Sequence, residues 1–213
     1  MRNPKRGITA AQLRLLALML MLTDHIGRTL FPGQVWMICL GRLAFPIFTF
    51  QTAEGYRHTR HFKRYCLRLA IFSLISEIPF DLMAFGTVFY PAHQNVMLTL
   101  LLGLIACRLY DRGTGWTALL TIPVAALLHT DYGAPGVIMV LLFHVLRKEA
   151  LLQLFCLFAL NAFGYGLFSI QTLAVLAWVP ISLYRGEKGQ GGKVLQYGSY
   201  AFYPVHMLIL GLL

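Results

Sequence analysis

The chain of 213 residues is rich in apolar side chains and poor in charge: 58% of its residues are hydrophobic, 12% are charged, and its mean hydropathy is +0.66. A soluble globular domain carries about 25% charged residues, so this composition argues against that class and predicts a protein that lies in lipid. The formal net charge is +10. Its cations occur in short blocks between apolar runs, a pattern that sets membrane orientation and does not indicate nucleic-acid binding.

Nine apolar segments are predicted to be transmembrane helices, since a helix needs about 20 apolar residues to cross the hydrocarbon, with a range near 17 to 25. Several are shorter than that norm. The amino-terminal run resembles a signal peptide, but it contains Asp24 and His25 and is interpreted as the first span. In chain order the segments are residues 10–30, 35–55, 65–85, 96–110, 116–129, 135–146, 151–163, 168–184 and 197–213.

The distribution of cations predicts the orientation, because cytoplasmic connections are enriched in Lys and Arg. With nine spans only Arg28 and Arg42 point outward. The other 16 of the 18 cations share one side: Arg2, Lys5, Arg6, Arg14, Arg57, Arg60, Lys63, Arg64, Arg68, Arg108, Arg112, Arg147, Lys148, Arg185, Lys188 and Lys193. We therefore expect an all-α integral membrane protein, a single helical domain over residues 1–213, with its N-terminus cytoplasmic and its C-terminus outside. Residues 185–193 are predicted to be a flexible polar loop.

Polar side chains collect in the outer halves of these predicted spans. A central charge costs roughly 2.5 to 3.5 kcal/mol in a membrane, so such residues should face the bundle interior and be paired. Asp24 and Arg28 have the spacing of a helix-end ion pair, and Glu77 with Asp81 could neutralise Arg42. The set comprises Asp24, His25, Arg28, Arg42, Glu77, Asp81, His93, Gln94, Asn95, His129 and Asp131.

His25 is the candidate general base of this set, because a neutral imidazole in a polar patch suits proton transfer near pH 7. Asp24 is its neighbour in sequence, but adjacent residues on a helix point about 100° apart. A carboxylate from another helix, Glu77 or Asp81, is therefore an equal candidate for orienting the ring. The sequence contains no helical metal-ligand spacing and no phosphate-loop or dinucleotide motif, so no metal is expected.

Five motifs resemble the TraX family in order across nearly the whole chain: LTDHIGR at 22–28, GRLAFPIFTFQTAEGYRHTR at 41–60, SEIPFD at 76–81, QNVMLTLLLGL at 94–104 and YAFYPVHMLIL at 200–210. That family includes conjugation proteins associated with N-terminal acetylation of pilin, and it resembles the wider group of transmembrane acyltransferases. The resemblance implies a bacterial inner-membrane acetyltransferase that uses acetyl-coenzyme A and an amine or hydroxyl acceptor such as pilin. It also implies that Asp24 and His25 carry the chemistry.

With that donor, we expect His25 to take the acceptor's proton, with Asp24 or Glu77 orienting it. Arg42, Gln94 or Asn95 would stabilise the oxyanion. Tyr203 and His206 match a family motif and either line this crevice or serve packing, and Asp81 is the remaining predicted substrate-binding residue. The phosphates of coenzyme A would meet the cations of the second connection, a set that positive-inside orientation alone also explains: Arg57, Arg60, Lys63, Arg64 and Arg68.

Two functions from other classes remain open on the sequence. One is a permease whose outer polar cluster binds a small ion or solute, although no inverted repeat supports it. The other is a non-catalytic assembly protein for a surface structure, which would bind a partner in the membrane and would tolerate loss of His25. Binding of acetyl-coenzyme A separates the enzyme from both.

Overall fold

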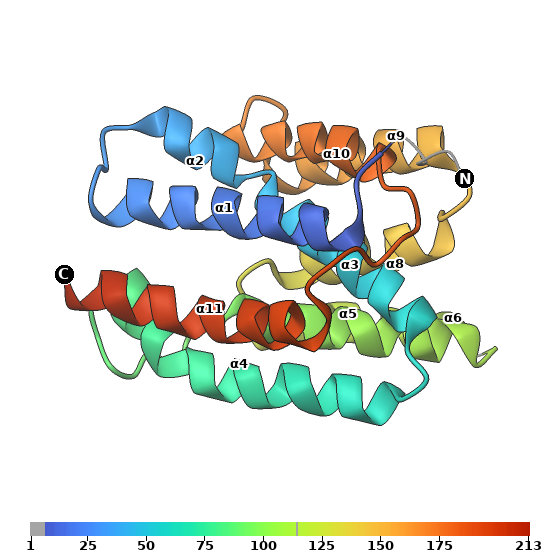
Figure 1. The fold of residues 1–213 in the computed structure, drawn as a ribbon, viewed down its shortest axis with the longest axis horizontal. Coiled ribbons are helices and arrows are strands. Elements are labelled where there is room, and N and C mark those ends of the chain that lie inside the picture. The colour runs from blue at the N-terminus through green and yellow to red at the C-terminus, as the bar shows by residue number, and fades with distance from the viewer. Residues whose placement is uncertain (1–6, 114) are drawn as a thin grey trace.

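A computed structural model describes residues 7–113 and 115–213, and this part of the chain is an all-helical bundle (Figure 1). The predicted all-α class is confirmed. The elements are α1 (Ala10–Thr29), α2 (Val35–Gly41), α3 (Ala44–His58), α4 (Phe62–Phe85), α5 (Val96–Asp111), α6 (Gly115–Leu119), α7 (Thr121–Leu127), α8 (Gly133–Val145), α9 (Ala150–Tyr165), the 3-10 helix η1 (Ile170–Ala177), α10 (Trp178–Ser182) and α11 (Gly192–Leu212).

Each of the nine predicted segments is helical, but three of them are divided into two elements. The divisions separate α2 from α3, α6 from α7, and η1 from α10. A proline follows each division closely: Pro46, Pro123 and Pro180. Proline has no N–H to donate to the carbonyl four residues earlier, and its ring crowds that carbonyl. The helix therefore breaks just before each of these prolines.

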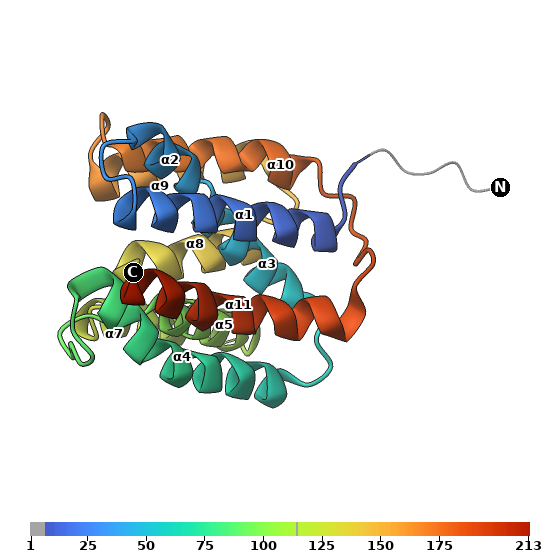
Figure 2. The same cartoon turned by 60° about the vertical axis from the view of Figure 1, so that its left-hand side comes forward.

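The helices run roughly side by side, and α3 crosses obliquely through the interior (Figures 1 and 2). It contacts α1, α5 and α8, and its buried residues include Phe45, Ile47 and Thr49. On one side, α11 packs along α4 and also touches α1. The two faces of α1 consequently meet different neighbours, with α2 and α3 on one face and α11 on another.

The two ends of the bundle differ in charge. The connections α3–α4, α5–α6, α8–α9 and α10–α11 lie at the end where α1 begins, and α11 terminates at the opposite end (Figure 1). Most of the described cations that were predicted to share one side belong to these connections and to the helix ends beside them, and Arg14 and Arg68 lie within the first two turns of α1 and α4. Arg2, Lys5 and Arg6 lie outside the described residues. Arg28 and Arg42 lie toward the opposite end, as expected.

Among the described residues, one stretch is both long enough and apolar enough to cross a membrane: Val35–His58, which comprises α2 and α3 and has 24 residues. The apolar helices α8 and α9 are shorter. Large apolar side chains are nevertheless exposed on the bundle surface, for example Phe163, Phe168 and Leu74 at 92%, 99% and 79% exposure. The nine-span topology thus stays a prediction.

The polar loop before α11 is not the free segment that its composition predicts. Its backbone pairs with the residues that precede α1: the Ile8 amide donates to the Leu183 carbonyl at 2.9 Å, and the Arg185 amide donates to the Ile8 carbonyl at 3.0 Å. The Ala10 amide donates to the Glu187 carbonyl at 2.8 Å. These bonds satisfy amides at the start of α1, and they hold the loop against that end of the bundle.

Close packing of α5 on α8 yields a first prediction, at Gly103. A Cβ atom there would lie 2.6 Å from Cγ2 of Val140, which is fully buried. We expect Gly103→Ala to lower the free energy of unfolding by about 1–3 kcal/mol through overpacking. Gly198→Ala in α11 is the control, since no atom lies within 4 Å of its added Cβ. Equal thermal stability of the two variants in detergent would contradict this packing.

Candidate functional site

A cavity of about 300 Å³ opens near the end of the bundle where α1 terminates. Drug-sized ligand sites usually occupy roughly 300–1,000 Å³, so this cavity suits a small group. Four of the predicted site residues line it: Asp24, His25, Arg42 and Tyr203. They come from α1, the α2–α3 junction and α11, so segments far apart in the chain converge there.

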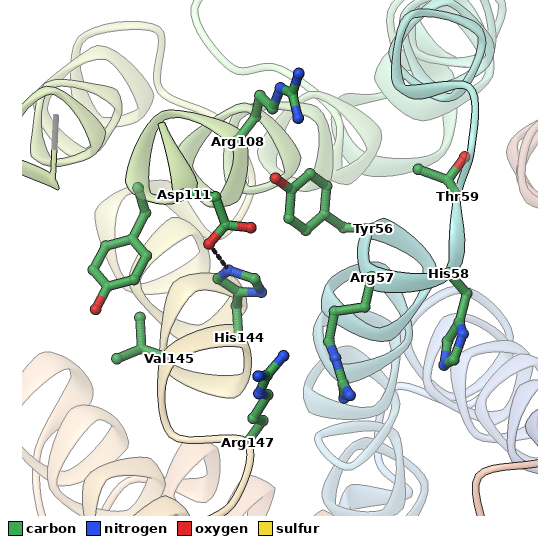
Figure 3. Close-up of a pocket in the computed structure, with 10 residues that line it drawn as sticks. Tyr56, Arg57, His58, Thr59, Arg108, Asp111, His144, Val145 and Arg147 are labelled. Atoms are coloured by element: carbon green, nitrogen blue, oxygen red, sulfur yellow. Dashed lines mark hydrogen bonds and ion pairs between the residues drawn. The ribbon is translucent and has the colours of Figure 1, made fainter. Parts of the chain in front are cut away.

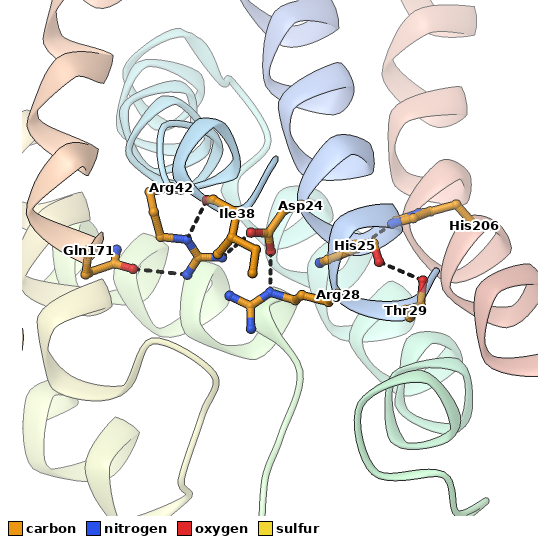
Figure 4. Close-up of polar contacts among 8 residues, drawn as sticks. All are labelled: Asp24, His25, Arg28, Thr29, Ile38, Arg42, Gln171 and His206. Carbon is orange, nitrogen blue, oxygen red and sulfur yellow. Dashed lines mark hydrogen bonds and ion pairs between the residues drawn. The ribbon is translucent and has the colours of Figure 1, made fainter. Parts of the chain in front are cut away.

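Asp24 is the centre of an ion-pair cluster (Figure 4). Its Oδ1 accepts a hydrogen bond from Nη2 of Arg42 at 2.6 Å, and its Oδ2 accepts one from Nε of Arg28 at 2.8 Å. Arg42 also donates to Oε1 of Gln171 at 3.1 Å and to the Ile38 carbonyl at 3.3 Å. The helix-end pair of Asp24 and Arg28 is confirmed.

The proline break explains why Arg42 reaches Asp24. Arg42 lies between α2 and α3, where the chain changes direction, and its side chain is 13% exposed. Gly41 beside it packs directly on the Asp24 side chain. The hypothesis that Glu77 and Asp81 neutralise Arg42 is wrong, because its carboxylate partner is Asp24.

His25 faces α11 and forms a chain of hydrogen bonds with it. Nδ1 of His206 lies 2.6 Å from the Phe202 carbonyl, and Nε2 of His206 lies 2.7 Å from Nδ1 of His25. A carbonyl only accepts, so His206 carries its proton on Nδ1 and, when neutral, presents a lone pair on Nε2. His25 must then donate through its own Nδ1–H. The basic lone pair of His25 is left on Nε2.

Figure 4 shows that the ring of His25 extends from this contact toward the side where Asp24 and Arg28 lie. His25 lines the cavity, and its ring is nearly parallel to that of His206, at an interplanar angle of 6°. The expected orienting group, a carboxylate of Asp24 or Glu77, is therefore replaced by the imidazole of His206. Adjacent positions on α1 send Asp24 toward the α2–α3 junction and His25 toward α11, as helical geometry requires.

The predicted polar residues at the end of α4 and the start of α5 have structural roles beside the cavity. Asn95 caps α5, accepting from the Met97 amide at 3.0 Å, and its own amide donates to the Ser73 carbonyl and to the Glu77 carboxylate. Asp81 accepts from the Tyr90 amide at 2.7 Å. Gln94 donates to the Pro91 carbonyl at 2.9 Å. These contacts fix the connection between α4 and α5.

Neither Gln94 nor Asn95, the predicted oxyanion donors, lines the cavity, and both N–H groups of the Asn95 amide are used in these bonds. Arg28 is better placed than either, since it lines the cavity, uses Nε for Asp24, and has a side chain that is 45% exposed. The sequence did not assign Tyr132, Tyr165 or Gln171 to the site, yet all three line the cavity. Gln171 could have been identified from the sequence, because it is an amide side chain inside an apolar segment.

His93 and Asp131 also line the cavity, and the structure pairs them across it, with Nε2 of His93 3.7 Å from Oδ1 of Asp131. The two belong to the α4–α5 and α7–α8 connections, which the parallel contact of Gln94 with Thr130 brings together. Both residues were expected in the outer polar set, and their pairing places the α7–α8 connection beside the cavity.

The His93–Asp131 pair predicts a pH dependence of stability. Interaction with Asp131 raises the pKa of His93 above its ordinary value of 6.5, against the opposing effect of partial burial. The stabilisation is thus fully present below about pH 6.5 and is lost as pH rises through the raised pKa. We expect thermal stability in detergent to fall over that upper range, and His93→Gln to remove this part of the slope. Parallel curves for the two proteins would contradict the pairing.

The predicted coenzyme A cations lie at the opposite end of the bundle and do not form one cluster. Arg60, Lys63 and Arg64 are exposed at the α3–α4 connection and the start of α4. Arg68 turns inward, with its guanidinium 5.2 Å from the ring centre of Tyr65. Arg57 alone of this set lines a pocket at that end. Among the described residues, no group of three or more His, Cys, Asp or Glu side chains could hold a metal.

Comparison with known proteins gives a consistent result over nearly the full chain. The family model described as "TraX protein" matches residues 9–213. The probable fimbrial assembly protein FimC, serogroup H1, of Dichelobacter nodosus is 30% identical, over 95% of this chain and 94% of its own length. Protein TraX of Escherichia coli (strain K12) is 28% identical, over 94% of this chain and 85% of its own length. No solved structure was found to match the chain.

Proposed function

Because this chain belongs to the TraX family, we propose that it is a multi-pass inner-membrane acetyltransferase. It would move an acetyl group from acetyl-coenzyme A to an amine or hydroxyl acceptor on the outer side of the membrane. The observation that carries the proposal is the cavity into which His25 presents a basic nitrogen, with an arginine beside it. A polypeptide amino terminus, such as that of a pilin, is the acceptor that the family resemblance implies.

The proposed membrane placement is supported by the surface of the bundle. Its connections at one end carry most of the described cations, and large apolar side chains are exposed between the ends. The pairs α6 with α7 and η1 with α10 are still shorter than the usual span, so each would cross as one broken helix through a locally thinned bilayer. Breaks of this kind are tolerated in a membrane where neighbouring helices cover the freed backbone groups.

In the proposed reaction, the acceptor nitrogen or oxygen attacks the thioester carbonyl while its proton passes to Nε2 of His25. The carbonyl oxygen becomes an oxyanion, which the terminal amino groups of Arg28 can meet. Collapse of this intermediate re-forms the carbonyl and breaks the carbon–sulfur bond. The coenzyme A thiolate leaves and takes up the proton from His25. The products are the acetylated acceptor and free coenzyme A.

The charge that develops on His25 is stabilised through its other nitrogen. Nδ1–H donates to His206, whose own Nδ1–H donates to the Phe202 carbonyl. These two hydrogen bonds fix the orientation and the tautomer of His25, as a buried carboxylate does in other catalytic sites. His206 is therefore a positioning residue in this proposal. Asp24 instead holds Arg28 and Arg42 in place.

The test is acetyl transfer by protein in nanodiscs, with radiolabelled acetyl-coenzyme A and a peptide that has a free amino terminus. The same peptide with a blocked terminus is the acceptor control, and released coenzyme A thiol is measured in parallel. We expect label on the free peptide and equimolar thiol. Folded protein that releases no thiol and labels neither peptide would overturn the proposal.

A non-catalytic assembly role is the second candidate, favoured by the similarity to a probable fimbrial assembly protein. It makes the opposite prediction for His25. A His25→Gln protein that supports normal assembly of a surface structure in cells, while binding no acetyl-coenzyme A, would favour this role over the enzyme.

A further inference from the structure

A second pocket, of about 560 Å³, lies at the opposite end of the bundle (Figure 3). It is formed where α3, α5 and α8 end. Three guanidinium groups line it, each from a different part of the chain: Arg57 on α3, Arg108 on α5 and Arg147 just after α8. Asp111 is the one carboxylate among the lining residues. The lining is thus positively charged and concave, as an anion site requires.

The wall of this pocket also contains a buried histidine. His144 has a side chain that is 6% exposed, and its Nε2 lies 2.8 Å from Oδ1 of Asp111. Its Nδ1 is buried and has no hydrogen-bond partner among the described residues, and the same holds for Nε of Arg108. Ionised Asp111 only accepts, so Nε2 of His144 donates to it and the neutral ring leaves Nδ1 as an acceptor. Phosphate oxygens are also acceptors, so the guanidinium groups, and not His144, supply the donors of this pocket.

The three arginines differ in how freely they can meet such a ligand. Arg57 donates to Glu54 at 2.8 Å, and Glu54 also contacts His58. Arg108 is half-buried, with its guanidinium 5.5 Å from the ring centre of Phe62. Arg147 is exposed after the end of α8. Arg108 is therefore a fixed member of the site, Arg147 can close on a ligand from the rim, and Arg57 shares its guanidinium with Glu54.

We infer that this pocket binds a phosphate-bearing ligand from the cytoplasmic side, with Arg57, Arg108 and Arg147 holding its phosphate oxygens. Guanidinium groups suit this task because they donate in a planar fork that matches phosphate geometry. Resting on the proposed function, the ligand is the diphosphate end of acetyl-coenzyme A. The headgroup of an anionic lipid carries the same chemistry and is the alternative source.

The position of the pocket is consistent with a long ligand. Tyr132 lines the outer cavity and His144 lines this pocket, and both belong to or adjoin α8. The two positions are 12 residues apart in sequence, which corresponds to about 18 Å of helix. The phosphates would thus be held at one end of α8 and the thioester would reach the other, along a path now filled by buried side chains such as Val140 and Phe143. Binding of the donor must displace some of that packing.

The test compares Arg108→Gln and Arg147→Gln with Lys63→Gln/Arg64→Gln, which alters exposed cations outside the pocket. Binding of coenzyme A and of inorganic pyrophosphate to detergent-purified protein is measured by calorimetry. Lipid binding is measured by native mass spectrometry with phosphatidylglycerol and phosphatidylcholine. We expect each pocket variant to weaken coenzyme A binding by about 10- to 100-fold, as loss of a charged hydrogen bond implies, and the control to change it little. Because Arg147 is exposed, its variant should fold even where Arg108→Gln does not.

The outcomes separate this inference from the proposed function. If the affinity for coenzyme A is unchanged in both pocket variants and lower in the Lys63→Gln/Arg64→Gln protein, the inferred phosphate site is wrong, and the proposed acetyltransferase function still stands. Arginine-dependent binding of pyrophosphate or phosphatidylglycerol without coenzyme A would support the anion site and remove the proposed donor. Folded wild type that binds none of these probes would overturn the inference.

Discussion

Replacing His25 with Gln should lower acetyl transfer by about 10²- to 10⁴-fold, the usual contribution of a positioned general base. Glutamine preserves much of the side chain's size and can still donate toward His206, so the bundle should fold. It has no basic nitrogen to receive the acceptor's proton. The measurement is kcat/KM for acetyl-coenzyme A with a saturating free-amine peptide, and the loss should fall on kcat. A folded His25→Gln protein with wild-type turnover would sink the proposed mechanism.

Variants of His206 separate positioning from simple packing. His206→Leu removes the acceptor for Nδ1–H of His25, so we expect reduced turnover and a changed pH profile. His206→Gln can restore that acceptor through its side-chain carbonyl oxygen and should recover part of the activity. If His206 were only a packing residue, Leu would serve at least as well as Gln, and the pH profile would stay that of wild type.

The outline of the fold is readable from the sequence because it depends on local information. Apolar runs of helical length predict all nine segments, and the blocks of cations predict which ends share a side. Even the three divided helices have a local cause, since Pro46, Pro123 and Pro180 each remove the hydrogen bond to the carbonyl four residues before them. Ends such as the start of α4 at Phe62 shift by a few residues, as helix ends usually do.

The site could be predicted only in part, because its decisive contacts join residues that are far apart in the chain. His25 and Arg42 were identifiable as costly polar groups in apolar surroundings. Their partners were not, since 181 residues separate His25 from His206 and 129 separate Arg42 from Gln171. Glu77 and Asp81 have the same sequence signal as Asp24, and only the packing of α4 against the following connection assigns them structural roles.

Asp24→Asn should destabilise the protein by about 3–5 kcal/mol, the cost of removing one partner from a buried ion pair. Asparagine keeps the shape against Gly41, but it leaves the guanidinium of Arg42 buried without a counter-charge. For a chain of this size, such a loss corresponds to a fall in Tm of about 6–20 °C, measurable by intrinsic fluorescence in detergent. Arg28 should matter less, since its exposed side chain can return to water.

The double variant Asp24→Leu/Arg42→Met tests whether the charge, and not the volume, causes that loss. Replacing both partners of a buried pair with apolar side chains of similar size is often neutral for stability, so this protein should melt near wild type. It should still fail to transfer acetyl groups, because Arg28 loses the carboxylate that holds it beside His25. If the Tm of Asp24→Asn equals that of wild type, Arg42 finds another partner. The ion-pair cluster would then be neither required for stability nor a fixed support for the oxyanion.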